Sequence, residues 1–299
     1  MPALSEQVLP SVWTLVYRLL VAHPGTSRDQ AIELLTPRGL VSRTGGSSES
    51  RHVRPTIASL IDLGIVEDRA GGLTVADDIK SGDDLRREVT SRFLSLPRDE
   101  EDPWRLRSET EPEHHAQLAV AWLHLQGVNT PLVGYPAAEE ALNRQLGDAR
   151  KLLRNTAPYN TLERVAGWCG VAASMYGGPG RASALVPDPT EAFRLRLDDL
   201  VPAGEEVPAR DVVSRLAEIF PWLPHGTVGR SVAQVLREVP DASDERGALS
   251  QGASIALMEL EVDGSLQLIP GDDASDRVTL TLTGSETRAV ARIRRGRVS

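Results

Sequence analysis

The sequence predicts a mainly helical fold of the α+β class, with small β-hairpins among the helices. Apolar residues recur at helical spacing along many segments, which indicates amphipathic helices. Three of these patterns, ending at Gly64, Gly170 and Gly264, pass at once into a short apolar strand. A turn and a second short strand follow each of them, so the two strands can pair as a hairpin. This is the order of the recognition helix and wing of a winged-helix module, so we expect tandem winged-helix modules joined by helical linkers.

The first module is expected to fill residues 1–78. A helix is predicted over 7–22, beginning at or just before Pro10, because proline is tolerated in the first turn of a helix. Ser27 is placed to cap a second short helix directly after it. A turn rich in Ser and Gly then leads into the third helix, and the two apolar runs within 65–75 form the hairpin.

The third helix of this module carries polar side chains near its start. In helix-turn-helix proteins this end of the recognition helix enters the major groove, where arginine reaches guanine edges or phosphates. The alternatives are that these residues are solvated surface, or that the module binds protein. The candidate DNA-contacting residues are Arg43, Arg51, His52, Arg54, Thr56 and Arg69.

The rest of the chain divides into a linker, two more modules and a tail. The linker contains the run RDEEDPWRLRSETEPE, whose mixed charges and prolines indicate a solvated loop. In the second module, Asn160 is expected to cap the recognition helix. The expected boundaries are a helical linker over 79–131, a second winged-helix-like module over 132–205, a third over 206–284 and a basic C-terminal tail over 285–299.

The third module and the tail differ in charge. The third module's helix carries Glu259 and Glu261, and its wing loop holds three aspartates. Because acidic surfaces repel phosphates, we expect this module to bind protein and not DNA. The tail either contacts phosphates flexibly or is simply solvated. Its arginines are Arg288, Arg292, Arg294, Arg295 and Arg297.

Composition limits the functions that are possible. The chain has 299 residues and a formal net charge of -9, so any DNA binding must come from a local basic patch. Lys80 and Lys151 are the only lysines, and neither stands in the context of a nuclease core or a phosphate-binding loop. The single cysteine excludes an intrachain disulfide framework. No apolar run approaches the roughly 18 residues that cross a bilayer, so we expect a cytoplasmic protein without membrane contact.

No catalytic set is visible in the sequence. His114, His115 and His124, with Glu111 and Glu113, match no compact zinc motif, and charged residues are expected on an amphipathic helix. The glycines of 177–180 fit a wing turn better than a phosphate-binding loop, and the aspartates of 272–276 lack the spacing of a calcium loop. Cys169 is expected to be a buried thiol. We therefore predict a protein that is not an enzyme and needs neither metal nor cofactor.

The second and third modules carry runs that resemble a known family. The runs VAGWCGVA after Glu163, ALVPDPTEAF, LPHGTV and ALSQGASIALMELEVDGSLQLIPGDDASD are similar to those of the DpdG-like proteins. Those proteins are found in bacterial gene clusters that place 7-deazaguanine bases in DNA and restrict unmodified DNA, among other antiviral defence loci. The resemblance implies a non-catalytic subunit that works with helicase and nuclease-like partners. It supplies no motif of functional residues.

The expected function is that of a DNA-binding adaptor subunit in a restriction-modification system. In this hypothesis the first module contacts DNA and the later modules hold a partner protein. Two alternatives remain open at this stage. One is a winged-helix transcriptional regulator, and the other is a structural winged-helix partner of an ATPase complex that makes no direct DNA contact.

Overall fold

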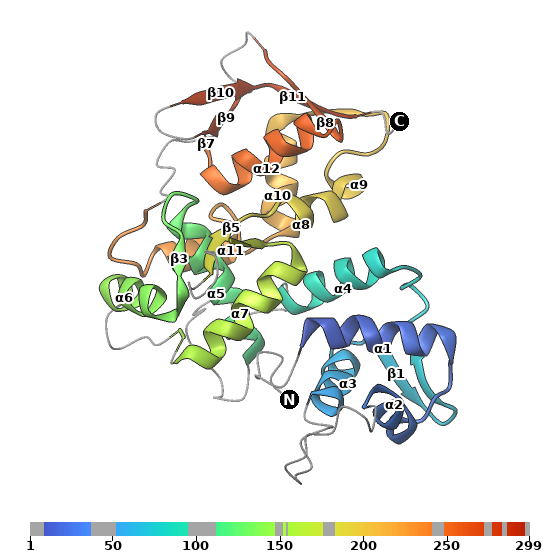
Figure 1. Ribbon diagram of the computed structural model, residues 1–299. Coiled ribbons are helices and arrows are strands. Elements are labelled where there is room, and N and C mark those ends of the chain that lie inside the picture. Colours follow the sequence, from blue (N-terminus) through green and yellow to red (C-terminus); the bar gives the residue numbers. More distant parts are fainter. Residues whose placement is uncertain are drawn as a thin grey trace.

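The computed structural model describes residues 9–36, 52–94, 112–146, 152–153, 155–175, 183–240, 248–271, 277–282 and 286–296 (Figure 1). It is mainly helical, with small sheets that are mostly antiparallel, as expected for the α+β class. The helices are α1 (Pro10–Ala22), α2 (Arg28–Leu35), α3 (Val53–Asp62), α4 (Gly82–Leu94), α5 (Pro112–Gln126), α6 (Gly134–Leu146), α7 (Thr156–Cys169), α8 (Thr190–Leu195), α9 (Leu197–Leu200), α10 (Ala209–Ile219), α11 (Thr227–Ala233) and α12 (Gln251–Val262). The strands are β1 (Val66–Arg69), β2 (Gly72–Val75), β3 (Leu132–Val133), β4 (Ala172–Met175), β5 (Ala184–Pro187), β6 (Glu206–Pro208), β7 (Ala248–Leu249), β8 (Leu266–Ile269), β9 (Val278–Thr281), β10 (Thr287–Val290) and β11 (Arg292–Arg295).

The first unit has the element order that the sequence predicts. Helices α1, α2 and α3 are followed by β1 and β2, which pair as an antiparallel hairpin. The Oγ of Ser27 accepts a hydrogen bond from the backbone N–H of Gln30 at 3.2 Å, which confirms the predicted cap of α2. Thr26, between α1 and α2, forms an antiparallel bridge with Leu73 of β2. The hairpin is therefore tied to the segment that enters α2.

The same order of elements occurs a second time, in α5, β3, α6, α7, β4 and β5. Here β3 pairs with β5, as Thr26 pairs with β2 in the first unit, and β4 completes the sheet in the order β3-β5-β4. The predicted cap of α7 is wrong by about one turn. Asn155 occupies that position, and its Oδ1 accepts from the N–H of Ala157 at 2.9 Å.

Residues 79–131 were expected to form a helical linker, but the helices of this segment are part of the core. Helix α5 is buried over its described side chains, with Leu118, Trp122 and Leu125 at most 2% exposed. It packs against α4, α7 and α11, so it belongs to the core of the second unit and is no spacer. Residues 95–111, which include the mixed-charge run, lie outside the described part of the chain.

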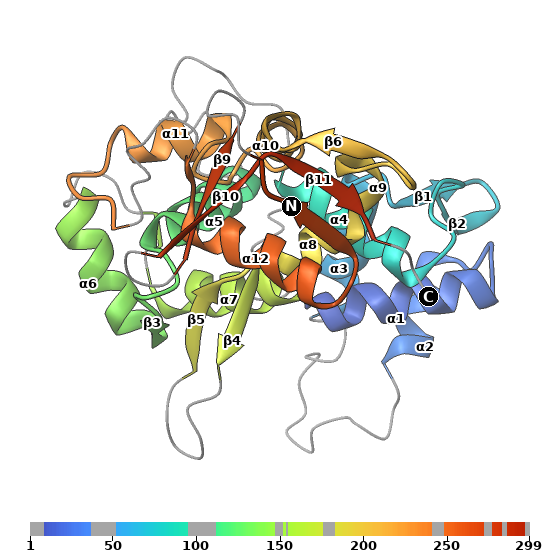
Figure 2. The ribbon, with the colours of Figure 1, turned by 90° about the horizontal axis from the view of Figure 1, so that it is seen from above.

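The predicted hairpin of the third module is wrong. Strand β8 pairs with β11 and not with β9, and β9 pairs with β10 and in parallel with β7. The predicted tail supplies these partners, because it contains the strands β10 and β11. In β11 the side chain of Ile293 points into the core beside Leu268, whereas its two arginine neighbours alternate outward. Seen from above, these strands lie over α12 (Figure 2).

The first unit packs directly on the second. The ring of Trp13 in α1 lies 5.1 Å from the ring of Trp168 in α7, edge to face, and 6.2 Å from the ring of Phe93 in α4. One continuous set of buried apolar side chains runs from α1 to β11. The first two units are therefore held together by an aromatic contact and by α4, which also touches α5, α7 and α8.

Candidate nucleic-acid interface and the α4 network

The structure places the candidate residues of α3 on different faces of the helix. Arg54 projects outward, with 60% of its side chain exposed, and its Nη2 lies 3.8 Å from Asp29 of α2. Thr56 is fully buried, at 0% exposure, so the prediction that it contacts DNA is wrong. The physical reason is its position one turn from Val53 and Leu60, which puts it on the apolar stripe of the helix. His52 precedes α3 and is half-buried.

The hairpin carries the last described candidate. Arg69 ends β1 and forms an ion pair with Glu67 of the same strand. Beside it, Arg28 of α2 contacts Asp68 of β1 at 3.1 Å, which fastens the hairpin to α2. Arg43 and Arg51 lie outside the described residues.

The described surface of this unit is not basic. Within 9–36 and 52–78 there are four arginines and seven carboxylates. Arg28, Arg54 and Arg69 each contact a carboxylate, and exposed pairs of this kind contribute only about 0–1 kcal/mol. Phosphate groups can replace such partners at little cost. The charge balance nevertheless limits the DNA affinity that these three residues provide by themselves.

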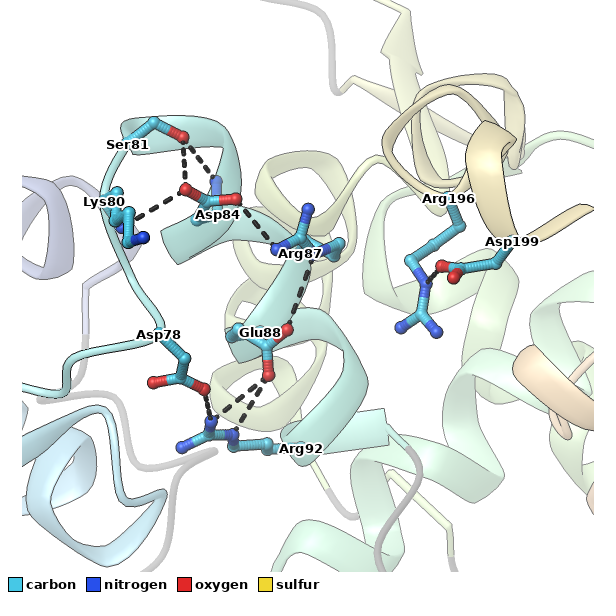
Figure 3. A network of polar contacts seen from close by, with 9 residues as sticks. All are labelled: Asp78, Lys80, Ser81, Asp84, Arg87, Glu88, Arg92, Arg196 and Asp199. Atoms are coloured by element: carbon cyan, nitrogen blue, oxygen red, sulfur yellow. Dashed lines mark hydrogen bonds and ion pairs between the residues drawn. The ribbon is translucent and has the colours of Figure 1, made fainter. Parts of the chain in front are cut away.

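A dense polar network runs along α4 (Figure 3). The Oγ of Ser81 accepts from the backbone N–H of Asp84 at 3.0 Å, which caps the start of the helix. In return, the Asp84 carboxylate accepts from the Oγ of Ser81 at 2.9 Å and from the backbone N–H of Lys80 at 3.2 Å. The hydrogen bond from Ser81 is the main reason why the pKa of Asp84 is lowered. Further along, Arg87 contacts Asp84 at 2.8 Å, and Arg92 contacts Asp78 at 2.8 Å.

Two arginines of α4 also reach the ends of two other helices. Arg92 donates from Nη1 to the carbonyl oxygens of Leu63 and Gly64, at 3.2 and 2.7 Å, where α3 turns into β1. Arg86 donates from Nε to the carbonyl oxygen of Trp168 at 2.5 Å, where α7 turns into β4. The last carbonyls of a helix lack intrahelical partners and carry partial negative charge, so a cation stabilises them. These two arginines were not predicted from the sequence, because only the apolar side of the α4 segment carries a recognisable pattern.

The buried titratable groups are held in neutral forms. Burial lowers the pKa of His124 to about 4, and its Nε2 lies 2.8 Å from the carbonyl oxygen of Val171. Burial raises the pKa of the Cys169 thiol to about 11, as expected for an inert core cysteine. The side chains of 112–115, including His114 and His115, lie outside the description. Among the side chains that the structure does describe, no three His, Cys, Asp or Glu residues form a group that fits a metal ion.

The acidic helix of the third module is internally paired. Glu261 of α12 accepts from both terminal nitrogens of Arg288 and from the N–H of Leu268, and the hydrogen bond from Arg288 is the main reason why its pKa is lowered. Arg292 and Arg294 both pair with Glu206 of β6. Arg288, Arg292 and Arg294 of the predicted tail therefore form ion pairs within this part of the fold, whereas Arg297 lies outside the described residues. Glu261 offers less free negative charge than the sequence indicates.

A family model describing DpdG-like proteins matches residues 4–274, which is most of the chain. The chain belongs to the DpdG-like family. Membership of this family suggests involvement in a Dpd-type modification system and fits a 7-deazaguanine modification locus. Searches of curated proteins and of solved structures returned no significant match. In this DpdG-like chain, no helix in the described ranges has both the length and the apolar character to cross a bilayer.

Proposed function

We propose that this DpdG-like protein is a non-catalytic, winged-helix adaptor subunit of a Dpd-type modification or restriction system. Its first unit contacts DNA, and its C-terminal half holds another protein of the system, such as a helicase or nuclease. The observation that carries the proposal is the repeated order of helix, short strand segment, two helices and a hairpin, which is found in both of the first two units. This is the order of a winged-helix module.

The geometry of the first unit supports a recognition role for α3. The start of α3 and the hairpin after it belong to one small unit, and the exposed Arg54 and Arg69 come from these two elements. In winged-helix proteins the same two elements approach the duplex together. Because Thr56 is buried, the proposed DNA contacts are Arg43, Arg51, His52, Arg54 and Arg69.

The packing of the first unit on the second supports a rigid adaptor over a DNA-binding domain on a flexible hinge. Contacts of α1 and α4 with α7 fix the first unit on the second. DNA bound at α3 would therefore be held in a fixed position relative to the second unit. The exposed apolar side chains of Met175 and Val262 lie in the later parts of the chain, at 60% and 87% exposure. Methionine is enriched at protein interfaces, and single exposed apolar side chains, such as Leu15, Val21 and Leu34, occur in the first unit as well.

Titration of a labelled duplex against salt tests the proposal. Weak binding that is steeply salt-dependent supports the adaptor, whereas strong discrimination for one operator-like sequence supports a transcriptional regulator. No binding supports a purely structural subunit of an ATPase complex. Arg51→Ala with Arg54→Ala should abolish the binding, while Arg144→Ala, which removes an exposed charge from α6, should leave it unchanged. Equal affinity of the double variant and the wild type would remove this site assignment.

A further inference from the structure

Helix α7 holds the position in the second unit that α3 holds in the first. It follows α6 and leads through Gly170 into the hairpin of β4 and β5. The carboxylate of Glu163, in the middle of α7, accepts from the Oγ of Ser174 in β4 at 2.8 Å and from the Oγ of Ser183, just before β5. One residue of the helix therefore fastens both arms of the hairpin, so the helix and the hairpin are held together.

One side of α7 is an exposed polar stripe. Thr156, Asn160 and Arg164 follow one another at intervals of four residues, which places them on the same side of the helix, and all three are exposed. The opposite side carries Leu162 and Val165, which are at most 1% exposed. The stripe covers about 12 Å of helix, since each residue adds about 1.5 Å.

The rest of the fold does not engage the side chains of this stripe. Within the described part of the chain, none of the three makes a side-chain hydrogen bond or an ion pair. By contrast, the arginines of α2, α3 and β1 that were considered above each contact a carboxylate. Arg164 is therefore an exposed cation that can bind an anion without first breaking an ion pair.

The sequence around α7 is basic, although the whole chain is acidic. Between α6 and β5, residues 147–183 contain five arginines or lysines and two carboxylates, hence a formal charge of +3 in a chain of net charge -9. Of these seven, the structure describes Arg164 and Glu163, and Glu163 is turned toward the serines of the hairpin. The other five lie outside the described residues and are not part of the site. A local excess of positive charge complements the phosphates of a nucleic acid.

We infer that α7 is a second DNA-contacting helix, with Asn160 at a base edge in the major groove and Arg164 at a phosphate. The major groove of B-DNA is about 12 Å wide and admits an α-helix. The first turns of a recognition helix lie nearest the bases, where an asparagine amide can bond to an adenine edge. Arg164 is one turn further along, where a long cationic side chain reaches the DNA backbone. The inference rests on the proposed winged-helix function and adds a contact from the second unit.

Fluorescence anisotropy with the full chain and a labelled duplex, over a range of salt concentrations, tests the phosphate contact. Arg164→Ala should weaken binding roughly threefold or more and make the slope of log affinity against log salt shallower by about 1. Arg164→Lys keeps the charge and should keep the slope. Arg230→Ala removes an exposed arginine from α11 and should change neither quantity. Wild-type affinity and slope in Arg164→Ala would overturn the inference.

The base contact of Asn160 has a test of its own. A pool of duplexes randomised over about ten base pairs, one helical turn, is bound, recovered and sequenced. Asn160→Ala should relax the sequence preference at one position and leave the salt slope unchanged, because the amide carries no charge. The same preference in the variant and the wild type, or a wild type without any preference, would contradict this contact.

The assignments of α7 and of the first unit can fail separately. Binding that is lost in Arg51→Ala with Arg54→Ala but not in Arg164→Ala would contradict the role of α7 alone. The reverse result would support α7 and contradict the first unit. Absence of duplex binding by the wild type would contradict both. Circular dichroism spectra of all variants should match the wild type, because the substituted side chains of α7 are exposed.

Discussion

The guanidinium of Arg92 donates a 2.7 Å hydrogen bond to the carbonyl oxygen of Gly64, at the turn between α3 and β1. On the same helix, Arg86 donates to the carbonyl oxygen of Trp168, at the corresponding turn between α7 and β4. One helix thus caps the equivalent helix end in two units that share an order of elements. This arrangement explains why α4 is part of the core and does not behave as a linker.

Loss of one cap should destabilise the protein. Arg92→Ala removes a charged donor from two carbonyls, and we expect it to lower the free energy of unfolding by about 1–3 kcal/mol. Arg144→Ala removes an exposed, weakly paired arginine and should change it by less than about 0.5 kcal/mol. Urea unfolding followed by circular dichroism measures both. Equal effects of the two substitutions would show that the α4 cap contributes nothing to stability.

The glycine turns should differ in their tolerance of a side chain. Gly170 has a φ of 69°, and a Cβ there would lie 2.5 Å from the Cβ of Glu191 and 2.8 Å from Nη2 of Arg86. We expect Gly170→Ala to cost more than about 2 kcal/mol, from backbone strain and overpacking together. Gly82→Ala is the matched control, because nothing lies within 4 Å and alanine favours the helix. A thermal melt in which both variants match the wild type would refute the close packing at this turn.

The local pattern of the chain was largely predictable from the sequence, whereas long-range pairing was not. The helix stops at Gly64 and Gly170 follow from local chemistry, and the structure has a left-handed glycine at both positions. The partner of β8 depends on Ile293, which is distant in sequence and surrounded by arginines that resemble a solvated tail. Strand pairing of this kind is decided by burial of one face, which a single sequence does not show.

Acid should weaken the fold through His124. Its pKa is lowered from 6.5 to about 4, so the folded state binds fewer protons than the unfolded state in this range. The resulting stability is fully present above pH 6.5 and is lost as the pH falls toward 4, by about 2 kcal/mol at pH 5. The free energy of unfolding of His124→Phe should therefore fall less steeply between pH 7 and pH 5 than that of the wild type. Parallel pH profiles would contradict the buried neutral state.

The single cysteine provides a reporter of unfolding. Cys169 is fully buried and the pKa of its thiol is raised to about 11, so little thiolate is present at pH 8. We expect no reaction with a thiol reagent in the native protein and complete reaction in concentrated urea. Fast labelling of the native protein would show that α7 opens readily.

The candidate site was predictable only in part. Arg54 and Arg69 were expected to be exposed, and they are. The burial of Thr56 was predictable, because helical spacing places it one turn from Val53 and Leu60 on the apolar stripe of α3.

The salt dependence of duplex binding tests the central claim most directly. Fluorescence anisotropy would give the affinity of the wild type and of Arg51→Ala with Arg54→Ala over a range of salt concentrations. If both arginines contact phosphates, the slope of log affinity against log salt should become shallower by about 2 in the double variant. An identical slope and affinity in the two proteins would contradict DNA contact through the first unit.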